Sequence, residues 1–138
     1  MDLESVNDPV FSQKMMGEGI AILPTSTLVV SPCDGEITLI SDANHAFGMV
    51  GVDGVEILIH LGIDTVKYKG EGFKRIAQVG KNIKQGEPVL EFNIDYFEKE
   101  NIDTTVMLIL LNHDKFDLDY TTNREVTYDT TIIEYIKK

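Results

Sequence analysis

Two histidines, His45 and His60, flank a predicted hairpin turn, and imidazole is the side chain best suited to proton and group-transfer chemistry near neutral pH. A neutral imidazole has one nitrogen with a lone pair, and a hydrogen bond at the other nitrogen decides which nitrogen that is. The nitrogen with the lone pair can attack phosphorus and carry a phosphoryl group, or it can bind zinc. Two converging rings suit either task, with one ring as nucleophile and the other as hydrogen-bond donor, or with both as metal ligands.

The stretch from residue 45 to residue 60 predicts a β-hairpin, because two apolar runs are separated by the turn sequence Gly-Val-Asp-Gly at 51–54. If the two-residue turn is Val52-Asp53, His45 lies directly opposite His60. If the turn is Asp53-Gly54, the two histidines are diagonal neighbours. Both registers leave the rings on one face, since side chains alternate along a strand. A three-residue loop with a bulge would break this alternation.

Residues just after His60 can assist the site. Gly62 could offer a backbone carbonyl that fixes the His60 tautomer, and Asp64 could tune the local field or receive a basic side chain of a partner. A single histidine on a strand is more often a packed or surface residue, so the convergence of two is what favours a site. The single Cys33 excludes an internal disulfide, makes a poor metal site alone, and is most simply a small core residue.

Composition predicts one cytoplasmic domain. A chain of 138 residues is long enough to bury a core, and no apolar run approaches the roughly 20 residues of a membrane span. The acidic N-terminus lacks the basic and apolar regions of a signal peptide. A net charge of −11 argues against nucleic acid as a partner and favours a basic partner surface.

Short apolar segments separated by turn residues predict an all-β sandwich or barrel. Besides the two histidine strands, the expected strands are Ile20–Leu23, Thr27–Ser31, Glu36–Ser41, Thr65–Tyr68, Phe73–Ala77, Val89–Asn93, Val106–Leu111, Glu125–Tyr128 and Ile132–Ile136. Single helical turns are expected at Phe11–Met16, at Asp95–Lys99 with an Asp cap, and at His113–Asp117.

The run Glu56-Ile57-Leu58-Ile59-His60-Leu61-Gly62-Ile63-Asp64-Thr65-Val66 resembles the phosphorylation motif of the glucose-family enzyme IIA of the bacterial sugar phosphotransferase system. The similarity continues downstream through Lys69-Gly70-Glu71-Gly72-Phe73 and upstream through Asn44-His45-Ala46-Phe47 and Gly17-Glu18-Gly19-Ile20-Ala21-Ile22. It covers the chain from about Val10 to Thr105. We therefore treat residues 1–138 as one domain similar to that family, short at its N-terminus.

The resemblance implies an antiparallel β-sandwich and a phosphotransferase component that acts as a phosphohistidine carrier. By this resemblance His60 is the phosphorylated residue, and His45 is its stabilising neighbour. By the same resemblance, the phosphoryl group comes from the phosphocarrier protein HPr and passes to a cysteine of the IIB domain of a sugar permease. The chain is expected to meet the membrane only through that permease.

The resemblance also implies a docking face around the histidines. Its apolar members are Val10, Phe11, Met15, Met16, Leu58 and Val66, and its acidic members, which meet basic residues of HPr, are Asp8 and Asp64. No cofactor and no resident metal is expected. In the family a zinc ion can bridge the two histidines and a carboxylate of a partner, so a metal there need not imply hydrolysis.

Three departures from the family pattern stand out. Members commonly carry Thr two positions before the first histidine, whereas this chain has Ala43, so a relay here needs another group to replace the hydroxyl. Members also usually begin with a strand and turn ahead of the position of Val6. The chain from Val106 onward is similar in strand pattern but weaker in residues.

Two alternatives compete with the relay. The glycine-spaced segment 79–89 also resembles turns of biotinyl and lipoyl carrier domains, but those domains need a lysine at a hairpin tip, and the tip here is Val52-Asp53. A regulatory protein of the same fold, which docks on transporters or kinases without passing phosphate on, is the other alternative. Ala43 and the short N-terminus favour it.

Overall fold

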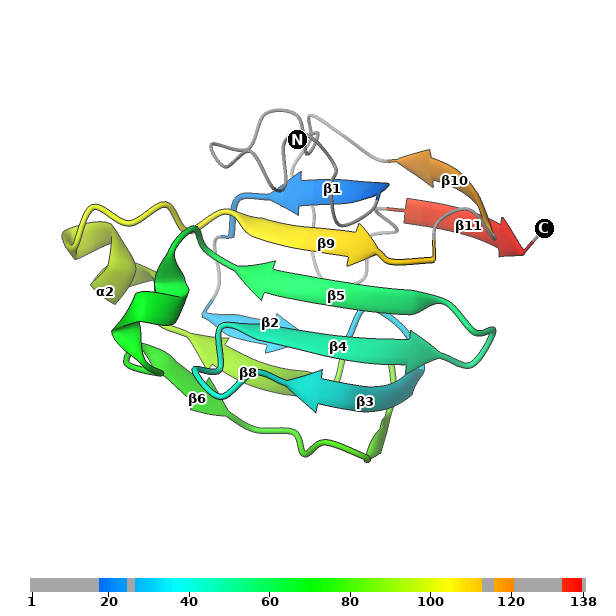
Figure 1. Ribbon diagram of the computed structural model, residues 1–138, viewed down its shortest axis with the longest axis horizontal. Coiled ribbons are helices and arrows are strands. Elements are labelled where there is room, and N and C mark those ends of the chain that lie inside the picture. The colour runs from blue at the N-terminus through cyan, green and yellow to red at the C-terminus, as the bar shows by residue number, and fades with distance from the viewer. Residues whose placement is uncertain (1–17, 25–26, 113–115, 121–132, 138) are drawn as a thin grey trace.

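The computed structural model describes residues 18–24, 27–112, 116–120 and 133–137, and strands make up most of them (Figure 1). The larger sheet has six strands in the order β1-β9-β5-β4-β3-β7, and each neighbouring pair is antiparallel. The bounds of these strands are β1 Glu18–Ile22, β9 Val106–Leu110, β5 Glu56–Leu61, β4 Ala46–Gly51, β3 Gly35–Ile40 and β7 Asn82–Ile83.

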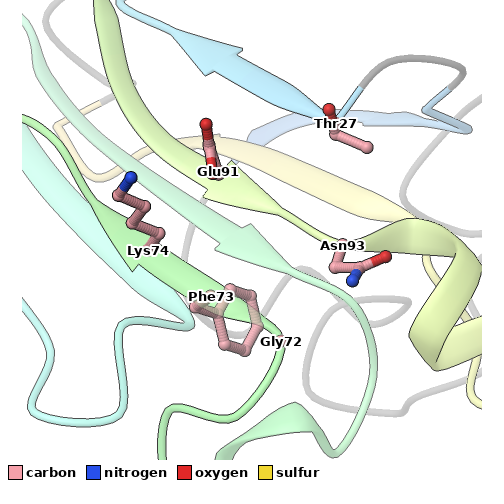
Figure 2. A pocket seen from close by; sticks show the side chains of 6 residues that line it. All are labelled: Thr27, Gly72, Phe73, Lys74, Glu91 and Asn93. Carbon is pink, nitrogen blue, oxygen red and sulfur yellow. The ribbon is translucent and has the colours of Figure 1, made fainter.

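A smaller antiparallel sheet has the order β2-β8-β6, with β2 Leu28–Val30, β8 Pro88–Phe92 and β6 Phe73–Arg75. An open hollow at this sheet is lined by Thr27, Gly72, Phe73, Lys74, Glu91 and Asn93 (Figure 2). Strands β10 (Phe116–Tyr120) and β11 (Ile133–Lys137) form a separate antiparallel pair. The predicted all-β antiparallel sandwich is confirmed, and its described sheets do not close into a barrel.

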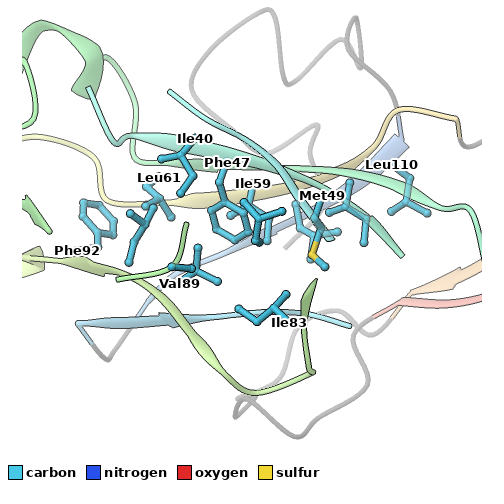
Figure 3. Close-up of a cluster of buried hydrophobic side chains, with 14 of the residues drawn as sticks. Ile40, Phe47, Met49, Ile59, Leu61, Ile83, Val89, Phe92 and Leu110 are labelled. Atoms are coloured by element: carbon cyan, nitrogen blue, oxygen red, sulfur yellow. The ribbon is translucent and has the colours of Figure 1, made fainter. Parts of the chain in front are cut away.

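The main core lies between the two sheets (Figure 3). On the larger sheet, Phe47, Ile59 and Leu108 occupy directly opposite positions of β4, β5 and β9 and are all buried. Val89 and Phe92 of β8 are buried on the facing side. Because side chains alternate along a strand, burial of the odd-numbered residues of β5 places its even-numbered residues on the outer face of the sheet.

Aromatic side chains close one end of the sandwich. The 3₁₀-helix η2 (Thr65–Tyr68) follows β5, and the helix α2 (Ile94–Lys99) follows β8 (Figure 1). The Tyr68 ring meets the Phe97 ring edge-on at a centroid distance of 5.2 Å, and Phe73 stacks on Phe92 at 5.2 Å. This packing ties the connection after β5 to the smaller sheet.

The hairpin between β4 and β5 has a three-residue loop, so both predicted two-residue turns were wrong. The Gly51 N–H donates to the Val55 carbonyl at 2.8 Å, and the residues between them form the loop. Gly54 has φ +89°, the left-handed conformation that such a loop requires. As a result Ala46, and not His45, lies directly opposite His60.

The predicted strand Thr65–Tyr68 is the 3₁₀-helix η2 instead. Its β-branched residues suggested an extended segment, but the Thr65 hydroxyl donates to the Leu61 carbonyl at 2.6 Å and folds the chain back. Asp64 and Lys69, on either side of the helix, have φ of 58° and 54° and interrupt any extended run.

The helical turn predicted at Asp95–Lys99 is present as α2, but Asp95 is not its cap. The Asn93 side chain accepts a hydrogen bond from the Tyr96 N–H at 3.1 Å and so occupies the N-cap position. Asp95 lies in the first turn, where its charge favours the positive end of the helix dipole.

The helical turn predicted at His113–Asp117 is wrong for Phe116 and Asp117, which belong to β10. The predicted turn Phe11–Met16 and the predicted strand Glu125–Tyr128 lie outside the described residues. Within the described part of the chain, no helix has both the length and the apolar character that crossing a membrane demands.

Replacing Ile59 by Ala should lower the free energy of unfolding by about 2–5 kcal/mol, since the side chain is 4% exposed and sits in the central row of the core. Val52→Ala is the control, because Val52 is 85% exposed at the hairpin tip and should change stability by less than about 0.5 kcal/mol. Urea unfolding monitored by circular dichroism measures both. Equal midpoints for the two variants would contradict the assigned core.

Candidate functional site

The rings of His45 and His60 lie together. Their centroids are 5.0 Å apart, with the ring planes at 79°, and both side chains are half-buried. The predicted convergence of the two imidazoles is therefore confirmed, although the register that was expected to produce it is not.

His60 projects from the middle of the larger sheet. It lies directly opposite Ala46 of β4 and Met107 of β9, and these three residues share the outer face. Leu58 is on the same face, half-buried against a small apolar cluster formed by Ala21, Ile63, Met107 and Ile109. His60 thus has small and apolar neighbours on the sheet.

The tautomer of His60 is set by the backbone. His60 Nδ1 is 2.8 Å from the Gly62 carbonyl oxygen, and a carbonyl can only accept, so Nδ1 carries the proton in the neutral ring. The lone pair is then on Nε2. Gly62 has φ +78°, and an added Cβ would lie 2.6 Å from Thr65 Cγ2, so glycine is required here. The role predicted for the Gly62 carbonyl is confirmed.

His45 reaches the site from a turn that precedes β4. The Ser41 N–H donates to the Ala46 carbonyl at 2.9 Å, and the Asn44 N–H donates to the Ser41 carbonyl at 2.8 Å. Asn44 has φ 59°, which reverses the chain just before His45. His45 precedes the regular part of β4, so the alternation of side chains between the two faces of the sheet does not fix the direction of its ring. The three-residue loop therefore does not separate the two rings.

Hydrogen bonds hold this turn from three sides. Ser41 Oγ lies 3.1 Å from His45 Nδ1 and accepts the Ala46 N–H at 3.1 Å. Arg75 of β6 donates to Asn44 Oδ1 from Nε at 3.1 Å and from Nη2 at 2.9 Å. The His45 carbonyl accepts the Leu61 N–H at 2.8 Å, which fastens the turn to β5.

Sequence reasoning missed Ser41 and Arg75. Ser41 was expected to be the last residue of a strand, and Arg75 lies 30 positions after His45 in the sequence, on a strand of the smaller sheet. A hydroxyl four residues before His45 was the one available signal. Nothing in the sequence pairs Arg75 with Asn44.

The other predicted site residues are partly placed. Asp64 and Val66 are exposed, the latter at 55%, on the segment that follows His60. Leu58 lies two residues before His60 on the same face. The remaining predicted docking residues, Asp8, Val10, Phe11, Met15 and Met16, are outside the described part of the chain.

Cys33 and the hollow of Figure 2 do not compete with the histidine pair. Burial, together with the charges of Asp53 and Asp34, raises the pKa of Cys33 to about 11, so its thiol stays protonated and unreactive. The hollow is open and lies at the smaller sheet, and its lining includes neither histidine nor cysteine. Among the described residues, no three of His, Cys, Asp or Glu gather as a metal site.

Comparison with known proteins agrees with this geometry. Residues 1–116 match the model of the family described as phosphoenolpyruvate-dependent sugar phosphotransferase system, EIIA 1. The chain is similar to the PTS system glucose-specific EIIA component of Haemophilus influenzae, with 38% identity over 138 residues, which is 100% of this chain and 83% of that protein.

Two further proteins, one of them a solved structure, are similar to this chain. The PTS system glucosamine-specific EIICBA component of Bacillus subtilis is 45% identical over 120 residues, which cover 87% of this chain and 19% of that protein. The structure of glucose permease IIA from Mycoplasma capricolum superposes with a TM-score of 0.89 at 28% identity, covering 96% of this chain and 86% of the other.

Gly62→Ala should lower the free energy of unfolding by about 1–3 kcal/mol, since the left-handed backbone and the contact with Thr65 both oppose a Cβ. Gly54→Ala is a matched control, because Gly54 has φ +89° but nothing within 4 Å of an added Cβ, so only the backbone strain remains. Urea unfolding should rank Gly62→Ala as the more damaging change. The reverse ranking would contradict the close approach of Thr65 Cγ2 to the position of an added Cβ at Gly62.

His45 should titrate below its ordinary pKa of 6.5, since burial disfavours its charged form. As pH falls below 6.5, the unfolded chain takes up this proton before the folded chain does, so the free energy of unfolding should fall between 6.5 and the lower folded pKa. NMR titration of the His45 ring measures the pKa, and urea unfolding of wild type and His45→Gln isolates the stability term. A pKa at or above 6.5 would contradict the burial described.

Proposed function

Because the chain belongs to the EIIA 1 family of the phosphoenolpyruvate-dependent sugar phosphotransferase system, we propose that it relays phosphoryl groups as a phosphohistidine on His60. The observation that carries this proposal is the paired geometry. His60 has its proton fixed on Nδ1 by a carbonyl, and a second imidazole lies beside it at a centroid distance of 5.0 Å.

The chemistry follows from the tautomer of His60. The lone pair on His60 Nε2 attacks the phosphorus of a donor phosphohistidine, the donor P–N bond breaks, and its electron pair stays on the donor nitrogen, which takes up a proton. In the second step a cysteine thiolate attacks the phosphorus, and the His60 Nε2–P bond breaks. His45 stabilises the transferring group by donating a hydrogen bond to phosphoryl oxygens.

We assign HPr as the donor and the cysteine of a IIB domain of a sugar permease as the acceptor. The EIICBA name of the Bacillus subtilis relative supports the permease assignment, since that name joins IIC, IIB and IIA. The exposed Asp64 and Val66 beside His60 support docking of a basic and partly apolar surface. Leu58 on the same face, and Asp8, Val10, Phe11, Met15 and Met16, complete the proposed docking face.

We propose that the relay operates in the cytoplasm, with residues 1–138 acting as one domain. The phosphoryl group adds roughly −1.5 to −2 charges beside apolar side chains. The docking face therefore presents different chemistry to its partners before and after phosphorylation.

Incubation with phosphoenolpyruvate, enzyme I and HPr should add one acid-labile phosphate to the chain, located on His60 by mass spectrometry. His60→Ala should abolish this labelling, because the acceptor nitrogen is gone. Labelling that persists in His60→Ala would move the site to another residue.

His45→Gln should still accept phosphate, since His60 remains. It should pass the group to a IIB domain roughly a hundredfold more slowly, as expected when a transition-state donor is weakened. Rapid-quench measurement of phosphate leaving the labelled protein gives this rate. Wild-type protein that accepts phosphate yet passes none to any IIB domain would favour the regulatory alternative.

A further inference from the structure

Ser41 occupies the junction between the turn and the His45 ring. Its backbone N–H and carbonyl both bond within the turn, to Ala46 and Asn44 at 2.9 and 2.8 Å. Its Oγ accepts the Ala46 N–H at 3.1 Å and lies 3.1 Å from His45 Nδ1. The hydroxyl is therefore held by the backbone in one place, with its own proton available for a single further acceptor.

We propose that Ser41 is the positioning residue that sets the tautomer of His45, and that it supplies the hydroxyl which this chain lacks at Ala43. Donation from Ser41 Oγ–H to His45 Nδ1 puts the ring proton on Nε2. The proposal rests on the relay function, because a proton on His45 Nε2 is what lets His45 donate to phosphoryl oxygens.

The two rings then hold opposite tautomers. His60 donates from Nδ1 to the Gly62 carbonyl and has its lone pair on Nε2, while His45 accepts at Nδ1 and carries its proton on Nε2. One ring is thus prepared as nucleophile and the other as donor before any partner binds. Two rings with the same tautomer would supply two nucleophiles or two donors, and either would be a poorer relay.

Arg75 holds the turn that carries Ser41. Its guanidinium donates twice to Asn44 Oδ1, at 3.1 and 2.9 Å, and Nη2 also reaches the Ser41 carbonyl at 3.3 Å. The fork geometry of arginine fits these two acceptors together, which a lysine ammonium does not do. Arg75 therefore positions Ser41 from the smaller sheet, and Ser41 positions His45.

The test uses Ser41→Thr and Ser41→Val, which have nearly the same shape and differ in the hydroxyl. In ¹⁵N NMR spectra of the unphosphorylated protein, wild type and Ser41→Thr should show His45 protonated at Nε2, and Ser41→Val should show a mixture of both tautomers. An unchanged His45 tautomer in Ser41→Val, or an Nδ1 proton in wild type, would overturn the proposal. This readout involves no phosphate, so it does not depend on the relay.

Transfer from labelled His60 to a IIB domain provides the second readout. Ser41→Val should slow transfer by roughly threefold to tenfold, as expected for one lost hydrogen bond, and Ser41→Thr should stay near wild type. His60 labelling by HPr in the same samples reports the relay separately. Equal transfer rates in Ser41→Thr and Ser41→Val, with both labelled, would overturn the role of Ser41 in transfer and leave the relay standing.

If Ser41→Val does not fold, Ser41→Ala serves as the variant that lacks the hydroxyl. Adding Ala43→Thr to Ser41→Ala should recover the Nε2 tautomer and most of the rate, since a hydroxyl is restored to the same turn, whereas adding Ala43→Val should recover neither. Ala43→Thr alone should change the rate little, because Ser41 already supplies the hydroxyl. Equal recovery by Thr and Val would overturn the proposal, since a methyl group cannot hydrogen-bond.

Discussion

Strand β5 is paired on both sides, by β4 and by β9, so its register cannot shift without breaking two hydrogen-bonded ladders at once. Ile59 and Leu61 point into the core, which leaves His60 between them on the outer face. A slip of one residue would expose these apolar side chains and bury an imidazole without its carbonyl partner. The same burial that stabilises the sheet therefore places the nucleophile.

The two histidines reach the same point by different physical routes. His60 is fixed by strand pairing and by the Gly62 carbonyl, which follows directly in the chain. His45 is fixed by a turn whose conformation depends on the left-handed Asn44 and on side-chain hydrogen bonds. We therefore expect a mutation in the core to displace the His60 ring more than the His45 ring. A mutation in the turn should displace the His45 ring more.

The sequence predicted most of the architecture because its apolar runs are short and its turn residues are frequent. It predicted the role of Gly62, which follows His60 directly in the chain. It also predicted that His45 and His60 meet, but from a hairpin register that the three-residue loop rules out. It failed where a side chain overrode propensity, as when the Thr65 hydroxyl bonded to the Leu61 carbonyl and made a helix of a β-branched segment. The Arg75–Asn44 contact was not predictable, since it joins a strand of the smaller sheet to a turn 31 residues earlier that leads into the larger sheet.

That contact couples the turn that carries His45 to the smaller sheet. Arg75 extends from β6 in the smaller sheet, whereas the turn it holds leads into β4 of the larger one. A shift of one sheet relative to the other would strain this contact against the Leu61 N–H bond to the His45 carbonyl, which fastens the same turn to β5. The edge-on packing of Tyr68 against Phe97, which joins the connection after β5 to the helix after β8, opposes such a shift.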